Sequence, residues 1–243
     1  KILIAAGARP NIVPIPGIEN VPYMTSTEAL RQTKLPKSMI IIGGGYIGCE
    51  MGNFYGAMGC KIMTIQRGPL LLSREDKDVS EVFTKSWKKK YGIICNCKIK
   101  NVEKKSGKIV VTTNHGKFTA EKLLVATGVK PNSDLLEVEK TGVKVNKRGF
   151  ITVNKFMETN VKGIYALGDI AGVYMFRHSA NLEADYVTNN ILGNRVKVDY
   201  YPMPHAVFTS PQIAGVGLTE QQCIEQKKNY VVGKAFYKNT GMG

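Results

Sequence analysis

The sequence lacks any apolar run that approaches the ~20 residues a membrane-spanning helix needs, so we expect no membrane partner. It also lacks a recognisable signal peptide, because glycine and proline soon interrupt the strand-like segment that follows Lys1. With 43% hydrophobic and 22% charged residues, the 243-residue chain has a globular composition. It is long enough for one large domain or two ordinary ones.

Cysteine and histidine are scarce, which argues against a disulfide framework and a metal site. The five cysteines are odd in number and irregularly spaced, which favours a reducing, cytoplasmic setting. Only Cys95 and Cys97 lie close together, and we interpret them as ordinary strand cysteines rather than as a bridge or a metal site. The histidines, His115, His178 and His205, are isolated in sequence. We therefore expect no metal and no catalytic triad.

Acidic residues are few: 19 against 34 lysines and arginines, which gives a net charge of +15. The basic residues are scattered, with one short run at 88–90, and no basic motif contains interleaved aromatic residues. A nucleic-acid site requires clustering on one face, so we expect no nucleic-acid partner. A basic surface suits anionic cofactors instead.

The clearest motif is the pattern G-x-G-x-x-G within residues 40–50, which follows an apolar run and precedes a helix-compatible stretch. In a dinucleotide-binding turn, Gly43 allows the tight bend and Gly45 lets the backbone approach a pyrophosphate. Gly48 lets the helix pack closely on the strand. The helix N-terminus then offers free N–H groups to the phosphates. A chance glycine turn is the alternative.

The surrounding pattern predicts a β-α-β unit and an α/β fold. We expect a strand at 39–42, a helix at 46–58 and a second strand at 61–66. A further helix is expected at 76–91, and strands joined by hairpins at 98–126.

Residues 2–10 and 123–131 echo each other, because each is an apolar strand followed by Ala-x-Gly-x and then a basic residue and proline. We expect the first, at 2–6, to be a buried strand. Residues 26–30 predict a helix start with Ser26 or Thr27 as N-cap.

A third strand runs into a glycine turn at 163–172, this time with an acid. From about residue 201 the character changes, and 206–209 and 213–218 predict strands of another domain.

In this order the elements resemble the two-dinucleotide flavoprotein disulfide reductases, the family of dihydrolipoamide dehydrogenase and of glutathione, mercuric and mycothione reductases. The most specific segments are 43–50, 126–128, 166–169 and 208–217. The resemblance covers essentially the whole chain. It implies a two-dinucleotide-binding, Rossmann-like α/β flavoprotein fold with the start of an α+β dimerisation domain.

The resemblance implies four parts: the end of an FAD-binding domain at 1–36, an NAD(P)-binding domain at 37–126, a return to the FAD domain at 127–199, and the start of the dimerisation domain at 200–243. The redox cysteine pair and the His-Glu pair of such enzymes would lie outside this sequence. We therefore interpret the chain as an internal part of a longer homodimeric enzyme, without dithiol chemistry of its own.

The implied activity is that of an FAD-dependent NAD(P)H:disulfide oxidoreductase, similar to dihydrolipoamide dehydrogenase, with a small-molecule disulfide or dithiol as substrate. A mercuric- or mycothione-reductase type of NADPH enzyme is an alternative, as is a flavin oxidase or ferredoxin-type reductase of the same fold. A non-enzymatic nucleotide-binding module is a third possibility.

The resemblance also assigns site residues around the glycine turn. Tyr46 would shield the flavin until nicotinamide displaces it, Glu50 would pair with a lysine beside the flavin, and Ile47 belongs to the same cofactor-binding turn. A packed tyrosine and a helix-dipole acid are the alternatives.

Two positions after the second strand bear on cofactor choice. Gln66 stands where NAD sites carry an acid for the ribose hydroxyls, and Arg67 suits a 2′-phosphate, with Arg74 as a second contact. This favours NADP over NAD, although NAD stays possible. A solvated turn arginine is the alternative for Arg67.

For FAD, the resemblance implies that Asp169 binds the ribityl chain and that Gly168 lets the backbone approach it. Thr127, Gly128 and Lys130 would lie near the flavin. A turn-capping aspartate is the alternative for Asp169.

Overall fold

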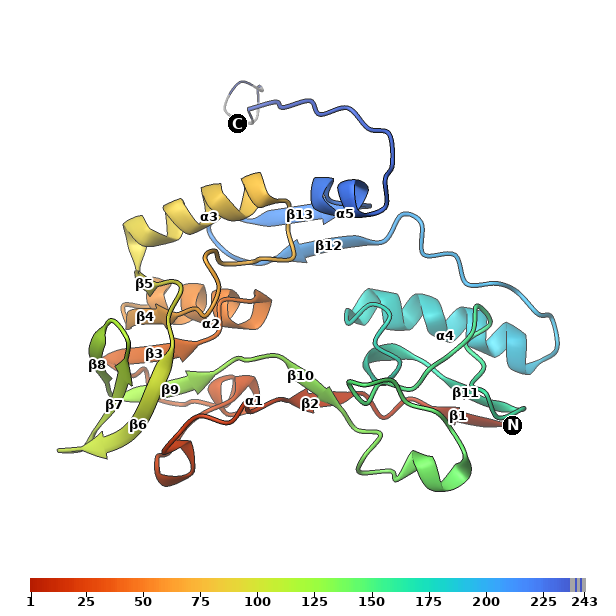
Figure 1. Cartoon of the computed structure of the whole chain (residues 1–243), viewed down its shortest axis with the longest axis horizontal. Coiled ribbons are helices and arrows are strands. Elements are labelled where there is room, and N and C mark those ends of the chain that lie inside the picture. The colour runs from red at the N-terminus through yellow and green to blue at the C-terminus, as the bar shows by residue number, and fades with distance from the viewer. Residues whose placement is uncertain (237–238, 240, 242–243) are drawn as a thin grey trace.

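The computed structural model describes residues 1–236, 239 and 241, which form two lobes with a C-terminal segment lying over the first (Figure 1). The helices are α1 (Ser26–Ala29), α2 (Tyr46–Ala57), α3 (Lys77–Lys90), α4 (Arg177–Ile191) and α5 (Glu220–Glu225), with short 3₁₀ turns η1 (Ile18–Asn20), η2 (Val138–Thr141) and η3 (Gly168–Ile170). The strands are β1 (Ile2–Ile4), β2 (Ala8–Pro10), β3 (Ser38–Ile42), β4 (Lys61–Ile65), β5 (Gly92–Ile94), β6 (Ile99–Lys105), β7 (Lys108–Thr113), β8 (Gly116–Ala120), β9 (Lys122–Val125), β10 (Val129–Pro131), β11 (Ile164–Ala166), β12 (Pro204–Val207) and β13 (Ile213–Val216).

The first lobe is built on a four-stranded parallel sheet in the order β5-β4-β3-β9. Successive side chains of a strand point to opposite faces. Met39 and Ile41 of β3 therefore join the apolar core shared with α2 and α3, whereas Ile40 and Ile42 join the core shared with β6 and β7. All four are almost completely buried, which explains why this strand reads as a continuous apolar run.

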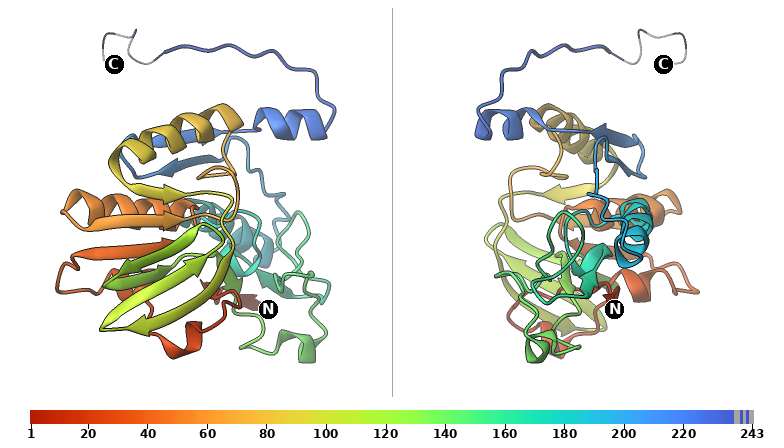
Figure 2. Two further views of the ribbon diagram at one scale, coloured as in Figure 1. Left: turned by 60° about the vertical axis from the view of Figure 1, so that its left-hand side comes forward. Right: turned by 90° about the vertical axis from the view of Figure 1, so that its right-hand side faces the viewer.

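The antiparallel sheet β6-β7-β8 covers the face of the parallel sheet opposite α2 (Figure 2, left). Its first hairpin turns at Ser106 and Gly107, both with positive φ of 48° and 77°. Two successive positive φ values match the twist of paired strands in a tight hairpin. The resulting order of layers is helices, parallel sheet and antiparallel sheet.

The second lobe contains β1, β11 and α4, and β2 and β10 lie between the two lobes (Figure 1). β1 pairs in parallel with β11, and β2 pairs antiparallel to β10. The expectation of a buried strand at 2–6 is wrong, because Ile2 is 57% and Leu3 45% exposed. Among the described residues β11 is the only strand paired with β1, so much of its apolar surface stays uncovered.

The C-terminal segment packs on the first lobe through the hairpin β12-β13. Val207 of β12 is fully buried in the core shared by α2 and α3. The Lys90 ammonium group, at the end of α3, donates to the carbonyl oxygen of Ser210 at 2.8 Å. This hairpin therefore brings residues from beyond 200 onto α2, next to the glycine turn.

The predicted helices and strands of the first lobe are confirmed within one or two residues at each end. The predicted cap of α1 is wrong by one position: Thr25 is the N-cap, in a reciprocal capping box with Glu28. The strand placement of Cys95 and Cys97 is also wrong, because both lie in the connection between β5 and β6. All five cysteines are free thiols.

Candidate functional site

The glycine turn between β3 and α2 has a shape that only glycine permits at two of its positions. Gly43 has φ of +112°, and a Cβ atom there would lie 2.3 Å from the carbonyl oxygen of Ala126. A Cβ atom on Gly48 would lie 2.1 Å from the carbonyl oxygen of Gly43. Both contacts are with backbone, which cannot move aside as a flexible side chain can. Close packing of helix on strand therefore depends on these two glycines.

Gly45 differs from its neighbours because it faces solvent and a Cβ atom there would meet nothing within 4 Å. It is the N-cap of α2 and has extended backbone. The first N–H groups of a helix have no partner within it and carry a partial positive charge. The open backbone at Gly45 and the start of α2, where Tyr46 and Ile47 lie, can thus receive an anionic group such as a pyrophosphate.

The end of β4 supplies Gln66, whose side chain is engaged with the glycine turn. Its Oε1 accepts from the Gly44 N–H at 3.0 Å, and its Nε2 donates to the carbonyl oxygen of Leu70 at 3.0 Å. One lone pair and one N–H remain for any ligand. Arg67 and Arg74 are exposed, and neither forms a hydrogen bond or ion pair with a described residue. Both guanidinium groups are therefore available to an anionic ligand.

The segment after β4 folds back over the turn and is fixed there. The Leu72 N–H donates to the carbonyl oxygen of Gly44 at 2.8 Å, and the Ser80 hydroxyl donates to that of Leu72 at 2.8 Å. Leu71 packs so closely that a Cβ atom on Gly44 would lie 2.3 Å from its Cδ2. This segment carries Glu75 into the interior beside α2.

Glu75 joins Tyr46 and His205, which the sequence did not associate. The Tyr46 hydroxyl donates to Glu75 Oε1, and His205 Nε2 lies 2.8 Å from Glu75 Oε2. Burial and then the bond to Glu75 raise the pKa of Tyr46. The fold thus gives His205 a partner that its isolated position in the sequence did not indicate. Glu75 lies shortly before α3, and an acid at such a position is ordinarily explained by the start of the helix. Nothing in the sequence therefore pointed to its contact with Tyr46 and His205.

Glu50, one turn into α2, contacts the C-terminal hairpin. Its Oε1 accepts from the Phe208 N–H at 2.9 Å, and Asn53 Oδ1 accepts from the Ser210 N–H at 3.1 Å. These bonds join backbone and side chains about 160 positions apart, which sequence spacing cannot reveal. One carboxylate oxygen of Glu50 is not used by these contacts.

In the second lobe, the turn after β11 is held by a buried carboxylate. The Gly168 N–H donates to Glu183 Oε2 at 2.6 Å, and the Tyr200 hydroxyl donates to Glu183 Oε1 at 2.7 Å. Burial, the largest influence, raises the pKa of Glu183, and burial also raises that of Asp169. The Asp169 carboxylate is partly buried and has no hydrogen-bond partner among the described residues, so it can accept from a ligand hydroxyl.

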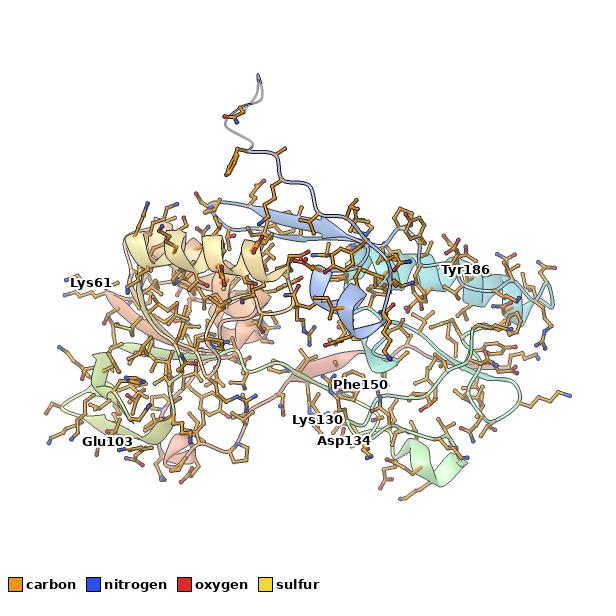
Figure 3. The ribbon with its side chains drawn as sticks, turned by 45° about the horizontal axis from the view of Figure 1, so that its top comes forward. Lys61, Glu103, Lys130, Asp134, Phe150 and Tyr186 are labelled. Atoms are coloured by element: carbon orange, nitrogen blue, oxygen red, sulfur yellow. The ribbon has the colours of Figure 1, made fainter. Side chains whose placement is uncertain are left out.

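The crossing between the lobes carries Thr127, Gly128 and Lys130. The Thr127 hydroxyl donates to the carbonyl oxygen of Asn11 at 2.6 Å, and Gly128 has φ of +105° with open space where a Cβ atom would lie. Lys130 forms an ion pair with Asp134 at 2.7 Å, and Figure 3 shows the two side by side. Arg9 contacts the same carboxylate at 2.7 Å. Asp134 is thus shared by two cations, and one positive charge remains among the three groups.

The described residues contain no group of three or more histidine, cysteine or acidic side chains that could hold a metal ion. Within residues 1–236, 239 and 241, no helix is long and apolar enough to cross a membrane.

Comparison with known proteins gives two family matches. Residues 1–184 match the family described as pyridine nucleotide-disulphide oxidoreductase, and residues 203–242 match its dimerisation domain. The chain is similar to dihydrolipoyl dehydrogenase of Haemophilus influenzae, with 37% identity over 236 residues, which is 96% of this chain and 49% of the relative. It is also similar to mercuric reductase of Staphylococcus aureus, with 37% identity over 93% of this chain and 42% of the relative.

Among solved structures, the HOCl-induced flavoprotein disulfide reductase of Escherichia coli is similar, with a TM-score of 0.83 and 31% identity. That match covers 93% of this chain and 53% of the other. The chain spans about half the length of the curated relatives it matches.

Proposed function

The chain belongs to the pyridine nucleotide-disulphide oxidoreductase family, and on that premise we propose that it is the central part of an FAD-dependent NAD(P)H:disulfide oxidoreductase. The observation that carries the proposal is the position of Tyr46. It starts the helix after the glycine turn and stacks on Phe176 of the second lobe, with ring centroids 5.9 Å apart. Its ring thus lies between the candidate dinucleotide site and the lobe that carries Asp169.

The dinucleotide is proposed to lie along the glycine turn. Gly45 leaves room for a pyrophosphate at the start of α2, where Tyr46, Ile47 and Gly48 follow. Gln66 supports the turn through Gly44. Arg67 and Arg74 are proposed to read a 2′-phosphate, since the residue directly after β4 is Gln66 rather than a carboxylate that would repel it. The NADP preference rests on these residues, and NAD is the alternative.

FAD is proposed to lie against the second lobe. Asp169 offers a free acceptor to a ribityl hydroxyl. Gly168 is buried and its N–H donates to Glu183, so Asp169 carries this part of the proposal. Thr127, Gly128 and Lys130 would line the crossing beside it. When bound, the flavin supplies the two-electron chemistry between NAD(P)H and a disulfide. Tyr46 would cover the nicotinamide position until the dinucleotide arrives, and Glu50 would pair with a lysine beside the flavin.

The larger assembly follows from the same proposal. We infer domain parts at 1–36, 37–126, 127–199 and 200–243, and a cytoplasmic homodimer that acts on a small-molecule disulfide or dithiol. A dihydrolipoamide dehydrogenase-like enzyme is the first candidate. An NADPH enzyme of the mercuric or mycothione reductase type is the second, favoured by Arg67.

A comparative titration of the chain with NADPH and NADH tests the dinucleotide site. We expect NADPH to bind more tightly, and Arg67→Ala to weaken NADPH binding by roughly tenfold while leaving NADH unchanged. Arg31→Ala is the matched control, because Arg31 is an exposed arginine at the end of α1. A preference for NADH that survives Arg67→Ala would contradict the NADP assignment, and binding of neither would contradict the dinucleotide site.

A further inference from the structure

Glu75 is a buried acid whose two oxygens face two different partners. It is only 4% exposed. Tyr46 donates to Oε1, and His205 Nε2 lies 2.8 Å from Oε2. The partners come from α2 and β12, so the acid links the glycine turn to the C-terminal hairpin. A carboxylate placed this way fixes both groups at once, because hydrogen bonds to a charged acceptor are among the stronger ones.

The rings around Glu75 form a stack that fixes the orientation of Tyr46. Tyr46 lies 5.9 Å from Phe176 and 6.3 Å from His205, with interplanar angles of 25° and 24°. Phe176 in turn lies 6.3 Å from His205 at 9°. The His205 imidazole packs on Gly215, the residue opposite it in β13, where a Cβ atom would come within 2.6 Å of the ring.

We propose that Glu75, oriented by His205, is a positioning residue that latches Tyr46 in the closed position over the nicotinamide subsite. The proposal rests on the function proposed above, in which Tyr46 must move aside for nicotinamide. Movement of the ring would break the bond from its hydroxyl to Glu75 and separate it from Phe176. The latch therefore opposes binding of the nicotinamide half of the ligand and leaves the adenosine half unaffected.

Because the latch should affect only the nicotinamide half of the ligand, it can be distinguished from a purely structural role of Glu75. The chain is titrated with NADPH and with 2′-phospho-ADP-ribose, which lacks nicotinamide. Tyr46→Phe removes the bond to Glu75 while keeping the ring, so we expect NADPH to bind roughly tenfold more tightly and 2′-phospho-ADP-ribose to bind unchanged. Glu75→Gln keeps a weaker, neutral acceptor, so its gain for NADPH should lie between wild type and Tyr46→Phe.

Tyr186→Phe is the matched control, because Tyr186 lies on α4 away from the first lobe (Figure 3). It should change neither affinity. Unchanged or weaker NADPH binding in Tyr46→Phe would overturn the latch, as would an equal shift for both ligands. If neither ligand binds to the wild-type chain, the dinucleotide site itself fails, and the latch fails with it. If both ligands bind to the wild-type chain but Tyr46→Phe does not tighten NADPH binding selectively, the latch is overturned and the dinucleotide site stands.

Discussion

Residues 42–48 in the first lobe and 166–169 in the second each lead a strand into a turn that contains a glycine with positive φ, but different contacts hold the two turns. In the first, Gly43 and Gly48 sit against backbone so closely that no side chain fits. In the second, the Gly168 N–H depends on Glu183, a buried acid on α4. The first turn therefore requires that its own glycines lack side chains, whereas the second requires a buried acid from another element.

The largest expected effect breaks the first turn. Gly43→Ala places a methyl group 2.3 Å from a backbone oxygen, at a φ of +112° that disfavours any side chain. We expect the free energy of unfolding to fall by roughly 2–4 kcal/mol, measured by urea denaturation of the chain.

Gly45→Ala is the matched control for that change, since open space surrounds Gly45 and its φ is −83°. Its free energy of unfolding should change by less than about 1 kcal/mol, whereas NADPH binding should weaken by roughly tenfold because the methyl group faces the phosphates. Equal destabilisation by both substitutions would show that packing at Gly43 is not what holds the turn.

The same contrast explains what the sequence could and could not predict. The strand β3, the glycine turn and α2 follow from local periodicity and steric demand, and these appeared close to their predicted bounds. The Rossmann-like fold followed from the family resemblance.

The long-range contacts that complete the site could not be predicted from local periodicity or steric demand. Glu75 and His205 are 130 positions apart, and Glu183 lies 15 positions from the turn that it supports. The burial of Glu75 and Glu183 results from tertiary packing, whereas an isolated Glu in sequence is most simply explained as exposed. The free acceptor at Asp169 was predicted from resemblance, but the acid behind it was not.

The second prediction tests the support from Glu183. Glu183→Leu would leave the Gly168 N–H and the Tyr200 hydroxyl without their buried acceptor, so the free energy of unfolding should fall by roughly 2–3 kcal/mol. Glu183→Gln retains an amide oxygen and should lose less. If Glu183→Leu is as stable as wild type in urea denaturation, the second turn does not depend on this carboxylate.

The pH dependence of stability sharpens the contrast within the second lobe. Burial raises the pKa of Glu183 above its ordinary value of 4.5, so the native state holds a proton more tightly than the unfolded state. The stabilisation that comes from this tighter proton binding is therefore present below pH 4.5 and is lost as the pH rises through the raised pKa. The hydrogen bonds from Gly168 and Tyr200 are a separate contribution. Urea denaturation at a series of pH values from below 4.5 upward gives the free energy of unfolding of wild type and of Glu183→Gln. The difference, wild type minus variant, should decline as the pH rises. A flat difference would contradict this.

The smallest effect on stability is expected at Asp134, whose pKa shift has the opposite sign to that of Glu183. Arg9 and Lys130 hold its pKa below the ordinary value of 3.8, so its contribution is present above pH 3.8 and is lost as the pH falls. Both ion pairs of Asp134 are exposed and therefore screened by salt. Asp134→Asn should lower the free energy of unfolding by only a small fraction of the loss in Glu183→Leu, and by less at high ionic strength. Denaturation at low and high salt checks this. An effect as large as that of Glu183→Leu, or one that salt leaves unchanged, would mean that the crossing between the lobes is held as firmly as the buried turn.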